Sequence, residues 1–451
     1  MSVVSLPHLY SPREYQQPFW THMLVDRGLR RRADLVWHRR AGKDKTAWNW
    51  MIFSAICLRS GTYFYFFPTY AQGKKDLWDA LDRDGVPFLS HIPPEFLLPG
   101  GKNETEMQLK VRHQGGGISV IQVVGTDRYD SIRGSNPVGC VFSEFSYQDP
   151  AAAKVVQPIL RENDGWAVYV YTPNGRNHAY KLHMAATDKG KIGPEWYSSL
   201  LTIRDTGLFK VEDIAADVRV GTIDEDDVQR EYYCSFTGAI SGAYYAKQIE
   251  QAYADGRIAK VPWDGMMPTE TWWDLGIDDS MSIWFVQRTR GEIRLIDYEE
   301  HSGEGFAFYK KLLADKPYHY SQHIMPHDIS VRELGTGKTR LETATKIGIR
   351  PIRVASKDYN IMDGIQAARM MFSQCYFDET KCERGISALS SYHKQRDELR
   401  GVFSKQPVHD WSSHAADAFR TGARGSRSPE VETGPRQERA DTAWDPFQRE
   451  R

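Results

Sequence analysis

The sequence lacks the features that would place the protein in a membrane or an oxidising compartment. None of its 451 residues belongs to a run of about 18 consecutive apolar residues, so we expect no membrane-spanning helix. The N-terminus has no basic region followed by an apolar run, so we expect no signal peptide. The five cysteines have no paired short spacing, which argues against a zinc site and favours reduced thiols in a cytosol.

The chain also lacks an excess of charge of either sign. Lys and Arg number 58 and Asp and Glu number 59, which gives a formal net charge of −1. A nucleic-acid partner would have to meet local basic patches, because the overall charge neither supports nor excludes it. One such stretch is RGLRRR (27–32), although a solvated helix end has the same composition.

In the first half of the chain, short apolar runs alternate with helical stretches. Buried strands separated by helices indicate a parallel sheet, so the fold class that we predict is α/β. We place a helix at 46–60. The expected strands are 33–38, 61–69, 117–125, 139–144 and 166–175.

The second half begins after a joint rich in Pro and Gly, VPWDGMMP (261–268). The turn RGE between two of its strands indicates an antiparallel hairpin. The strands that we expect here are 271–276, 280–289, 293–300 and 323–328, with helices at 242–258 and 409–424. We therefore expect a first domain at 1–260, a linker at 261–268, a second domain at 269–424 and, because few apolar residues remain, a disordered tail at 425–451.

A possible phosphate-binding loop lies in WHRRAGKDKTAW (37–48). Gly42 and Lys43 stand between a predicted strand and a predicted helix, where backbone N–H groups and a Lys can hold phosphates. Compared with GxxxxGK[ST], the opening Gly is replaced by Trp37 and the hydroxyl residue by Asp44. Taken alone, the match is weak and fits a basic helix start equally well. The similar ELGTGKTR (333–340) follows no long buried strand and is not favoured.

The strand GCVFSE (139–144) favours the first loop. An apolar strand that ends in two acids usually supplies a metal-side Asp and a Glu that polarises the attacking water. Here the pair is Ser143 and Glu144, so Ser stands where Asp is usual, just as Asp44 stands where Ser or Thr is usual. We hypothesise that Asp44 and Ser143 exchange roles at one Mg²⁺. The alternative is a surface Asp44 that is favourable at a helix N-terminus.

Further segments fit a nucleotide site. Tyr15 and Gln16 are suited to the edge and face of adenine, although an ordinary helix start has the same pattern. Arg133 stands in a polar loop, where an Arg can sense phosphate or reach a neighbour's site. The turn YTPNG (171–175) could couple hydrolysis to movement, although a turn that simply ends a strand has the same pattern. The predicted nucleotide contacts are Tyr15, Gln16, Arg39, Arg40, Ala41, Gly42, Lys43, Asp44, Lys45 and Thr46.

The second half carries well-separated acids at the ends of predicted elements. Asp274 closes the first strand, Asp328 closes a later one, and Asp417 lies on the last helix, one turn after His414. Phosphodiester hydrolysis needs carboxylates that converge on two metal ions about 4 Å apart. Oxygen ligands favour Mg²⁺ or Mn²⁺. The order of these acids is typical of an RNase H-like nuclease, although capping and surface acids remain the alternative.

Together these segments resemble the large terminase subunit of tailed phages, an ATP-driven DNA-packaging motor. The resemblance covers residues 8 to 424. It rests, in order, on YQQPFW, HRRAGKDKT, DSIRG, CVFSEF, YTPNG, EYYCSF, DLG, PHD and HAADAFR. It implies a RecA-like (ASCE) P-loop ATPase followed by an RNase H-like nuclease.

The resemblance implies a role for each candidate site residue. Lys43 would hold the phosphates, Glu144 would be the catalytic glutamate, and Arg133 would act in a neighbouring subunit. Asp274, Asp328 and Asp417 would hold the nuclease metals, while the departures at Asp44 and Ser143 put in doubt how the nucleotide's metal is bound. The implied partners are double-stranded DNA, a small terminase subunit, the procapsid portal and a ring of five copies. The implied place is the host cytoplasm and the portal vertex, not the mature virion.

Three other functions are compatible with parts of the sequence. A helicase–nuclease of repair or recombination would share both sites, but further helicase motifs are missing between 180 and 260. A non-catalytic scaffold would account for the altered loop, although Lys43 and Glu144 argue against it. A nuclease whose first domain only holds DNA is the third.

Overall fold

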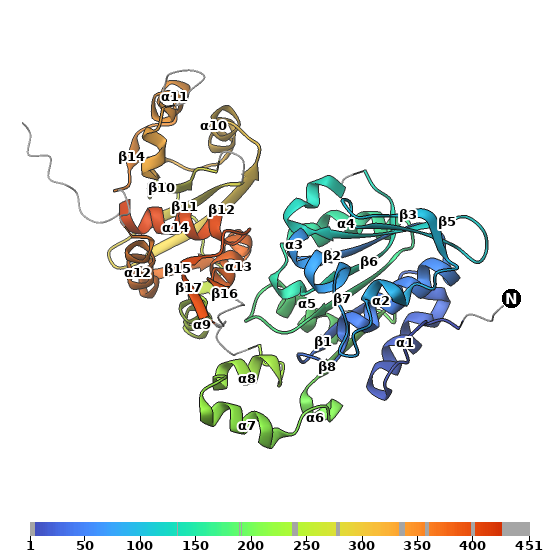
Figure 1. The fold of residues 1–451 in the computed structure, drawn as a ribbon. Coiled ribbons are helices and arrows are strands. Elements are labelled where there is room, and N and C mark those ends of the chain that lie inside the picture. Colours follow the sequence, from blue (N-terminus) through green and yellow to red (C-terminus); the bar gives the residue numbers. More distant parts are fainter. Residues whose placement is uncertain are drawn as a thin grey trace, which may run out of the picture.

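Two β-sheets, each covered by helices, organise the chain into two α/β domains that lie side by side (Figure 1). The computed structural model describes residues 5–132, 134–188, 190, 192–236, 242–276, 280–332, 339–356, 360–397 and 402–425. The predicted fold class is confirmed. In these ranges, no helix is both long and apolar enough to cross a membrane.

The first sheet is largely parallel. Its order is β3-β4-β5-β2-β6-β7-β1-β8, and only β3 and β4 run antiparallel to their neighbours, as a hairpin at one edge. Every residue of β1, β6 and β7 is buried, which explains why these strands are mostly apolar. The bounds are β1 (Arg32–Trp37), β2 (Thr62–Phe67), β3 (Leu97–Asn103), β4 (Gln108–Arg112), β5 (Ile118–Gly125), β6 (Pro137–Ser143), β7 (Trp166–Tyr171) and β8 (Trp196–Leu201).

Helices cover both faces of this sheet. On one face, Trp20 of α1 (Gln17–Leu24) and Trp50 of α2 (Lys43–Phe53) pack against Tyr63 and Leu35. On the other, α4 (Pro150–Glu162) and α5 (His178–Thr187) pack against the alternate residues of the same strands. The short α3 (Tyr70–Gly73) follows β2. This two-sided burial is what the alternation of strands and helices predicted.

A small helical unit follows β8 and was not predicted. It comprises α6 (Ile203–Thr206), α7 (Val211–Val220) and α8 (Glu225–Glu231), and extends away from the first sheet in Figure 1. Its core is formed by Ile203, Ile214 and Val228.

The second sheet has the order β14-β13-β10-β11-β12-β15-β9. Strands β10, β11 and β12 form an antiparallel meander, which confirms the predicted hairpin, and β13 and β14 add in parallel beside β10. The bounds are β9 (Ile258–Ala259), β10 (Thr269–Asp274), β11 (Ser280–Arg288), β12 (Ile293–Ser302), β13 (Tyr320–Met325), β14 (Ile352–Val354) and β15 (Cys375–Asp378).

Helices also pack on this second sheet. Phe419 of α14 contacts Trp272 of β10 and Trp284 of β11, so the last helix lies across the meander. The helices are α9 (Ala246–Ala254), α10 (Phe306–Asp315), α11 (Arg340–Ile347), α12 (Ile361–Met371), α13 (Glu383–Ser391) and α14 (Ser413–Gly425). A separate hairpin joins β16 (Lys394–Asp397) to β17 (Val402–Pro407).

The division between the domains lies earlier than the predicted linker at 261–268. Tyr245 and Ile249 belong to the second core, and β9 pairs with β15 at the edge of the second sheet. The joint at 261–268 is therefore a loop within the second domain, and the boundary at 260 is corrected. The predicted tail lies outside the described residues from 426 onward.

The domains meet through a buried ion network. Arg384 of α13 donates to both oxygens of Asp149, at 2.6 and 3.0 Å, and to Glu300 of β12 at 2.9 Å. Its guanidinium also lies 4.6 Å from the ring of Trp411, whose Nε1 donates to the carbonyl of Tyr147. This network joins the end of the first sheet to the segment that leads into α14.

Candidate functional site

The loop between β1 and α2 has the backbone shape of a phosphate cradle. Strand β1 ends at Trp37 and α2 begins at Lys43, so the first free N–H groups of the helix face the loop. Gly42 has a φ of +82°, and a Cβ there would lie 3.1 Å from Nε2 of Gln16. The left-handed backbone therefore favours glycine, and the close approach of Gln16 leaves little room for a side chain.

Lys43 and Glu144 face one another at the carboxyl end of this sheet. Nζ of Lys43, a residue only 6% exposed, donates to Thr172 Oγ1 at 3.2 Å and lies 3.5 Å from Glu144 Oε1. Burial alone would lower the pKa of Lys43, but Glu144, Asp44 and Glu231 outweigh it and raise that pKa. Burial raises the pKa of Glu144, against the effect of Lys43. The neighbouring carboxylates thus favour the charge on Lys43, whereas burial disfavours the charge on Glu144.

The backbone of Glu144 is unusual. Its φ of 51° and ψ of 45° place it in the left-handed region, which is uncommon for a residue with a β-carbon. Such strain is found mainly where surrounding structure fixes a side chain for function. Here the turn directs Glu144 into the space beside Lys43.

The two residues that depart from the usual loop are in direct contact. Ser143 Oγ donates to Asp44 Oδ1 at 2.5 Å, and Tyr65 OH donates to the same oxygen at 3.0 Å. Ser143 is fully buried, whereas Asp44 is partly exposed. Burial, followed by Asp44 and Glu144, raises the pKa of Tyr65 well above its ordinary value, so its phenol remains a donor.

The two residues predicted to contact adenine hold the loop. Gln16 is 2% exposed, and its Nε2 donates to the carbonyl of Ala41 at 3.1 Å. Its Oε1 accepts from Tyr10 and from the N–H of Arg13. Tyr15 OH also donates to the Ala41 carbonyl, at 2.9 Å. Gln16 thus has its hydrogen bonds within the protein, and the adenine contacts stay a prediction.

The remaining predicted nucleotide residues lie in different environments. Arg39 and Arg40 are exposed beside the loop. Lys45 donates to Asp82 Oδ2 at 2.7 Å, and Thr46 is fully buried with its hydroxyl bonded to Tyr10. Lys45 and Thr46 therefore have partners away from the cradle. Arg133 lies outside the described residues.

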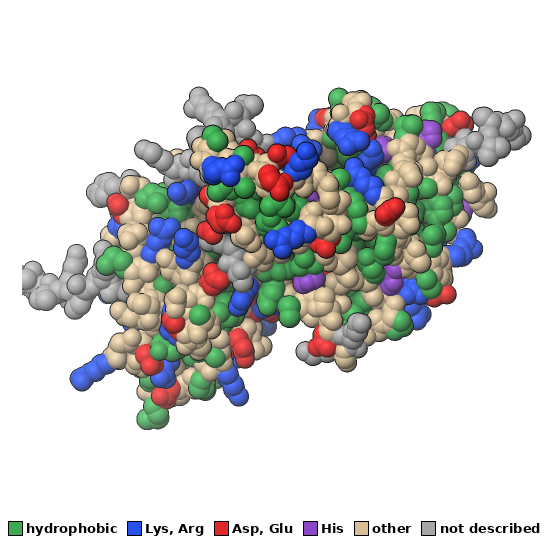
Figure 2. Space-filling model, turned by 90° about the horizontal axis from the view of Figure 1, so that it is seen from below, with side chains coloured by type: hydrophobic (Ala, Val, Ile, Leu, Met, Phe, Trp, Pro, Cys, Tyr) green, Lys and Arg blue, Asp and Glu red, His purple; other side chains and the backbone are tan. Residues whose placement is uncertain are grey.

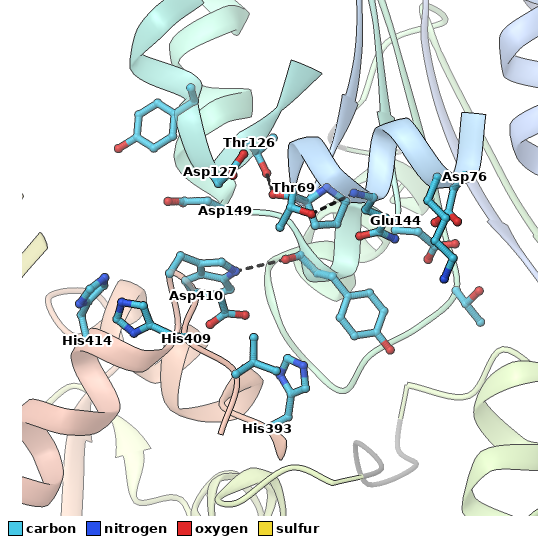
Figure 3. Close-up of a pocket in the computed structure, with 18 of the residues that line it drawn as sticks. Thr69, Asp76, Thr126, Asp127, Glu144, Asp149, His393, His409, Asp410 and His414 are labelled. Carbon is cyan, nitrogen blue, oxygen red and sulfur yellow. Dashed lines mark hydrogen bonds between the residues drawn. The ribbon is translucent and has the colours of Figure 1, made fainter. Parts of the chain in front are cut away.

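A cleft of about 980 Å³ brings this site together with the second domain (Figure 3). Glu144 and Asp149 lie on one wall, and His409, Asp410 and His414 lie on the other. Among the described residues, seven carboxylates and three Lys or Arg side chains line the cleft: Asp76, Asp127, Glu144, Asp149, Glu231, Glu300 and Asp410, against Arg39, Lys43 and Lys75. A bound triphosphate would therefore need a cation to offset these carboxylates.

Outside this cleft, charge of one sign does not gather on the face seen from below. Figure 2 shows Lys and Arg side chains interspersed there with Asp and Glu. In the stretch RGLRRR, Arg30 pairs with Asp164 and Arg31 pairs with Asp26. That stretch is thus partly neutralised by neighbouring acids.

Two of the three predicted nuclease acids are close neighbours. Asp274 ends β10, and its Oδ2 lies 3.4 Å from Nδ1 of His414 on α14. Asp417 follows one turn later and accepts from Arg420 at 3.1 Å. Burial, together with the charge of Asp274, raises the pKa of Asp417 to about 6, against the effect of Arg420. This combination of like charges is typical of a site that awaits a cation.

The third acid is apart from this pair. Strand β13 ends at Met325 rather than at Asp328, because Pro326 has no N–H to continue the ladder. Asp328 lies in the following 3-10 helix, 58% exposed and 3.0 Å from His327. Since β13 runs parallel beside β10, Asp328 still lies beyond the same sheet edge as Asp274. Within the described ranges no three His, Cys, Asp or Glu side chains are close enough to hold an ion, so the metal centre stays a prediction.

Three contacts of the nucleotide site were not predicted from the sequence. Tyr65 lies on β2 and looks like any other aromatic core residue, and Glu231 belongs to the unpredicted helical unit. Thr172 was part of the quoted turn YTPNG, and its position one residue beyond β7 was the available clue. Like β1 and β6, β7 ends at the carboxyl edge of the sheet, where ligands bind in open α/β folds.

No protein-family model and no curated protein sequence matches the chain. Solved structures with a similar fold include large terminases of bacteriophages. One from a thermophilic bacteriophage, in complex with ADP, is 14% identical and covers 91% of this chain and 98% of its own, with a TM-score of 0.40. The ATPase domain from Thermus phage P74-26 is 20% identical, covers 51% and 95%, and has a TM-score of 0.40. The nuclease domain from bacteriophage SPP1 with bound Mn is 16% identical, covers 34% and 84%, and has a TM-score of 0.28.

The residues present fit a nucleotide with a divalent cation. The cradle offers Gly42, helix N–H groups and a charged Lys43, all suited to phosphates. The carboxylates that line the cleft, together with Asp44, offer the oxygen ligands that Mg²⁺ prefers. At these identities and TM-scores, the function of the chain has to rest on such features of its own residues.

Proposed function

We propose that the chain is a DNA-packaging motor of the large-terminase type, which hydrolyses ATP to move double-stranded DNA into a procapsid and cuts it by metal-dependent hydrolysis. The observation that carries this proposal is the shared cleft. It joins Lys43 and Glu144 of the first domain to His414, the neighbour of Asp274, in the second.

In the nucleotide half, the chain supplies binding and the orientation of water. Lys43 and the first turn of α2 would hold the β- and γ-phosphates, which would draw Lys43 away from Glu144. Glu144, once released from Lys43, would accept a hydrogen bond from the attacking water. Bound Mg²⁺ would offset the phosphate charge. The buried contact of Lys43 with Thr172 ties this step to the end of β7.

In the nuclease half, Asp274 and Asp417 would hold Mg²⁺ or Mn²⁺, with Asp328 approaching from the neighbouring strand. Divalent ions supply charge stabilisation and an activated water in phosphodiester hydrolysis. His414, 8% exposed and beside Asp274, is placed to orient that carboxylate.

The remaining partners follow from this function. A packaging motor needs double-stranded DNA, a small terminase subunit and a portal on the procapsid. We propose that it acts as a ring of five copies on the portal, in the host cytoplasm, and leaves before the virion matures. Arg133 would reach the site of a neighbouring copy.

The nuclease activity gives the decisive test. Supercoiled plasmid is incubated with the protein in Mn²⁺, Mg²⁺ or EDTA, and the wild type is compared with Asp274→Asn and Asp328→Ala. Metal-dependent cutting that both substitutions reduce supports the proposal. Folded protein that never cuts, under any metal, contradicts it.

A helicase–nuclease of repair or recombination is the second candidate, because it would use the same two centres. A forked duplex with a labelled strand distinguishes the two activities. A packaging motor hydrolyses ATP without separating the strands, whereas a helicase releases the labelled strand. A non-catalytic scaffold would show no ATP hydrolysis at all.

A further inference from the structure

The usual positions of the carboxylate and the hydroxyl beside a nucleotide's metal are exchanged in this chain. P-loop enzymes hold Mg²⁺ with a Ser or Thr that follows the loop Lys and with an Asp at the end of a neighbouring strand. In this chain Asp44 follows Lys43, and Ser143 ends β6. The structure shows that these two residues touch, which the sequence alone did not establish.

We propose that Asp44 is the carboxylate ligand of the cation that accompanies the nucleotide. The hydroxyls of Ser143 and Tyr65 orient the Asp44 carboxylate. This inference rests on the proposed ATPase function and specifies how its metal is held. The carboxylate and one hydroxyl stand at the two usual positions with their places exchanged, and Tyr65 adds a second hydroxyl.

The hydrogen bonds around Asp44 leave one oxygen available. Oδ1 accepts from both Ser143 and Tyr65, at 2.5 and 3.0 Å. Among the described residues, Oδ2 accepts no hydrogen bond, and Asp44 is partly exposed. Mg²⁺ typically takes one or two carboxylates and keeps several waters. One anchored and one free oxygen is the arrangement that a single carboxylate ligand needs.

The position of the pair supports the same role. Asp44 and Ser143 do not line the cleft themselves, but Lys43 and Glu144, which are adjacent to them in sequence, do. Asp44, in the first turn of α2, is bonded to the last residue of β6, so the pair joins the two segments that carry Lys43 and Glu144. In P-loop enzymes, the metal is found between the β- and γ-phosphates.

A purely structural role of Asp44 would need only its hydrogen bonds to Ser143 and Tyr65, whereas metal binding also needs its negative charge. A substitution that removes the charge alone therefore tests the proposal. Asp44→Asn keeps an oxygen acceptor for Ser143 and Tyr65 but removes the charge. If Asp44 holds the cation, the substitution removes the metal-dependent part of nucleotide binding. If Asp44 only joins the helix to the strands, the substitution leaves that part intact.

The experiment is calorimetric titration of the full chain with ADP, in Mg²⁺ and in EDTA. We expect Mg²⁺ to tighten ADP binding to the wild type, and Asp44→Asn to lose about 10- to 100-fold of this gain. In EDTA the variant should bind ADP at least as tightly as the wild type, because it lacks a negative charge near the phosphates. Tyr65→Phe and Ser143→Ala should each lose about tenfold or less, since each removes one orienting bond. Asp84→Asn, an exposed carboxylate paired with Arg83, is the matched control.

The double variant Asp44→Ser/Ser143→Asp restores the usual arrangement and sharpens the test. We expect it to recover much of the Mg²⁺ gain that Asp44→Asn loses. Full Mg²⁺ dependence in Asp44→Asn would overturn the proposal. Absence of ADP binding to the wild type in either condition would instead overturn the proposed ATPase function, so the two failures are distinguishable.

Discussion

The nucleotide site and the carboxylate site differ in how far each is assembled by the folded chain alone. Lys43 and Glu144 carry opposite charges and lie 3.5 Å apart. Asp274 and Asp417 carry like charges, and the pKa of Asp417 is raised to about 6 by burial and by Asp274, while Asp328 is exposed. Opposite charges draw a site together, whereas like charges hold it open until a cation arrives.

This difference has a functional consequence. The first site can be poised for nucleotide before any ligand binds, and a phosphate would compete with Glu144 for Lys43. In the second site Arg420 offsets only part of the charge of Asp274 and Asp417, so we expect this site to be inactive until metal and DNA are both present. Under the proposed function this asymmetry would be useful, because a packaging nuclease must not cut while DNA is moving.

The largest effect should follow from removing the positively charged side chain of Lys43 from the nucleotide site. Lys43→Ala should reduce ATP hydrolysis by about 1,000-fold, because it removes the charged donor to the transferring phosphoryl group. Phosphate release at saturating ATP measures the effect. Lys110→Ala, an exposed lysine on β4, is the control. Hydrolysis at near wild-type rates in Lys43→Ala would show that the cradle is not the catalytic site.

In the second site, we expect each carboxylate to contribute to plasmid cutting by binding the metal ion. Asp274→Asn should reduce plasmid cutting by about 100-fold or more, because it removes charge that holds the cation. Raising Mn²⁺ should recover part of the cutting, since the defect is in metal affinity. Asp315→Asn, exposed at the end of α10, is the control. A defect that no Mn²⁺ concentration relieves would point to lost folding instead.

The link between the two sites should contribute stability. Arg384→Ala leaves Asp149 and Glu300 without their shared partner, with side chains only 9% and 10% exposed. We expect a loss of about 3 kcal/mol, at the low end for a broken buried pair because Arg384 is itself 25% exposed. Lys181→Ala breaks an exposed pair with Glu383 across the same interface and should cost about 0–1 kcal/mol. Denaturant unfolding compares the two, and equal losses would contradict the buried link.

The sequence predicted the parts of each site that depend on strand order. The buried strands β1, β6 and β7 are mostly apolar, with Arg32, Asp34 and Ser143 as exceptions, and their carboxyl ends place Lys43 near Glu144. The antiparallel hairpin of β3 and β4 was missed because β3 contains Pro99, Gly100 and Gly101 and is largely exposed. The domain boundary was misplaced because β9 has only two residues.

Contacts that depend on how helices and strands pack could not be predicted from the sequence. The bond from Tyr65 to Asp44 requires the first turn of α2 to lie over β2. The bond from Arg384 to Asp149 requires two domains to meet, and neither residue belongs to a motif. The spacing of residues along the sequence predicts neither hydrogen bond, because each bond depends on where a second helix or strand packs.

The smallest predicted effect concerns pH. The pKa of Asp417 is about 6 in the folded chain against an ordinary value of 3.8, because burial and Asp274 disfavour its charge. Below about pH 4 both the folded and unfolded forms are protonated, so Asp417 has no effect on stability there. Between about pH 4 and 6 only the unfolded form loses the proton, so the free energy of unfolding falls as pH rises, and the loss is complete above pH 6.

Asp417→Asn removes this penalty. In EDTA at pH 7.5 the variant should therefore be more stable than the wild type by about 1–2 kcal/mol, less than the full pKa difference implies because the side chain is partly exposed. At about pH 4 the two proteins should unfold alike. Urea unfolding at the two pH values measures the difference. Adding Mn²⁺ should narrow it at high pH, since a cation stabilises the ionised carboxylate that the variant lacks. A variant that is no more stable in EDTA at high pH would mean that Arg420 already compensates the charge, and that the second site is as assembled as the first.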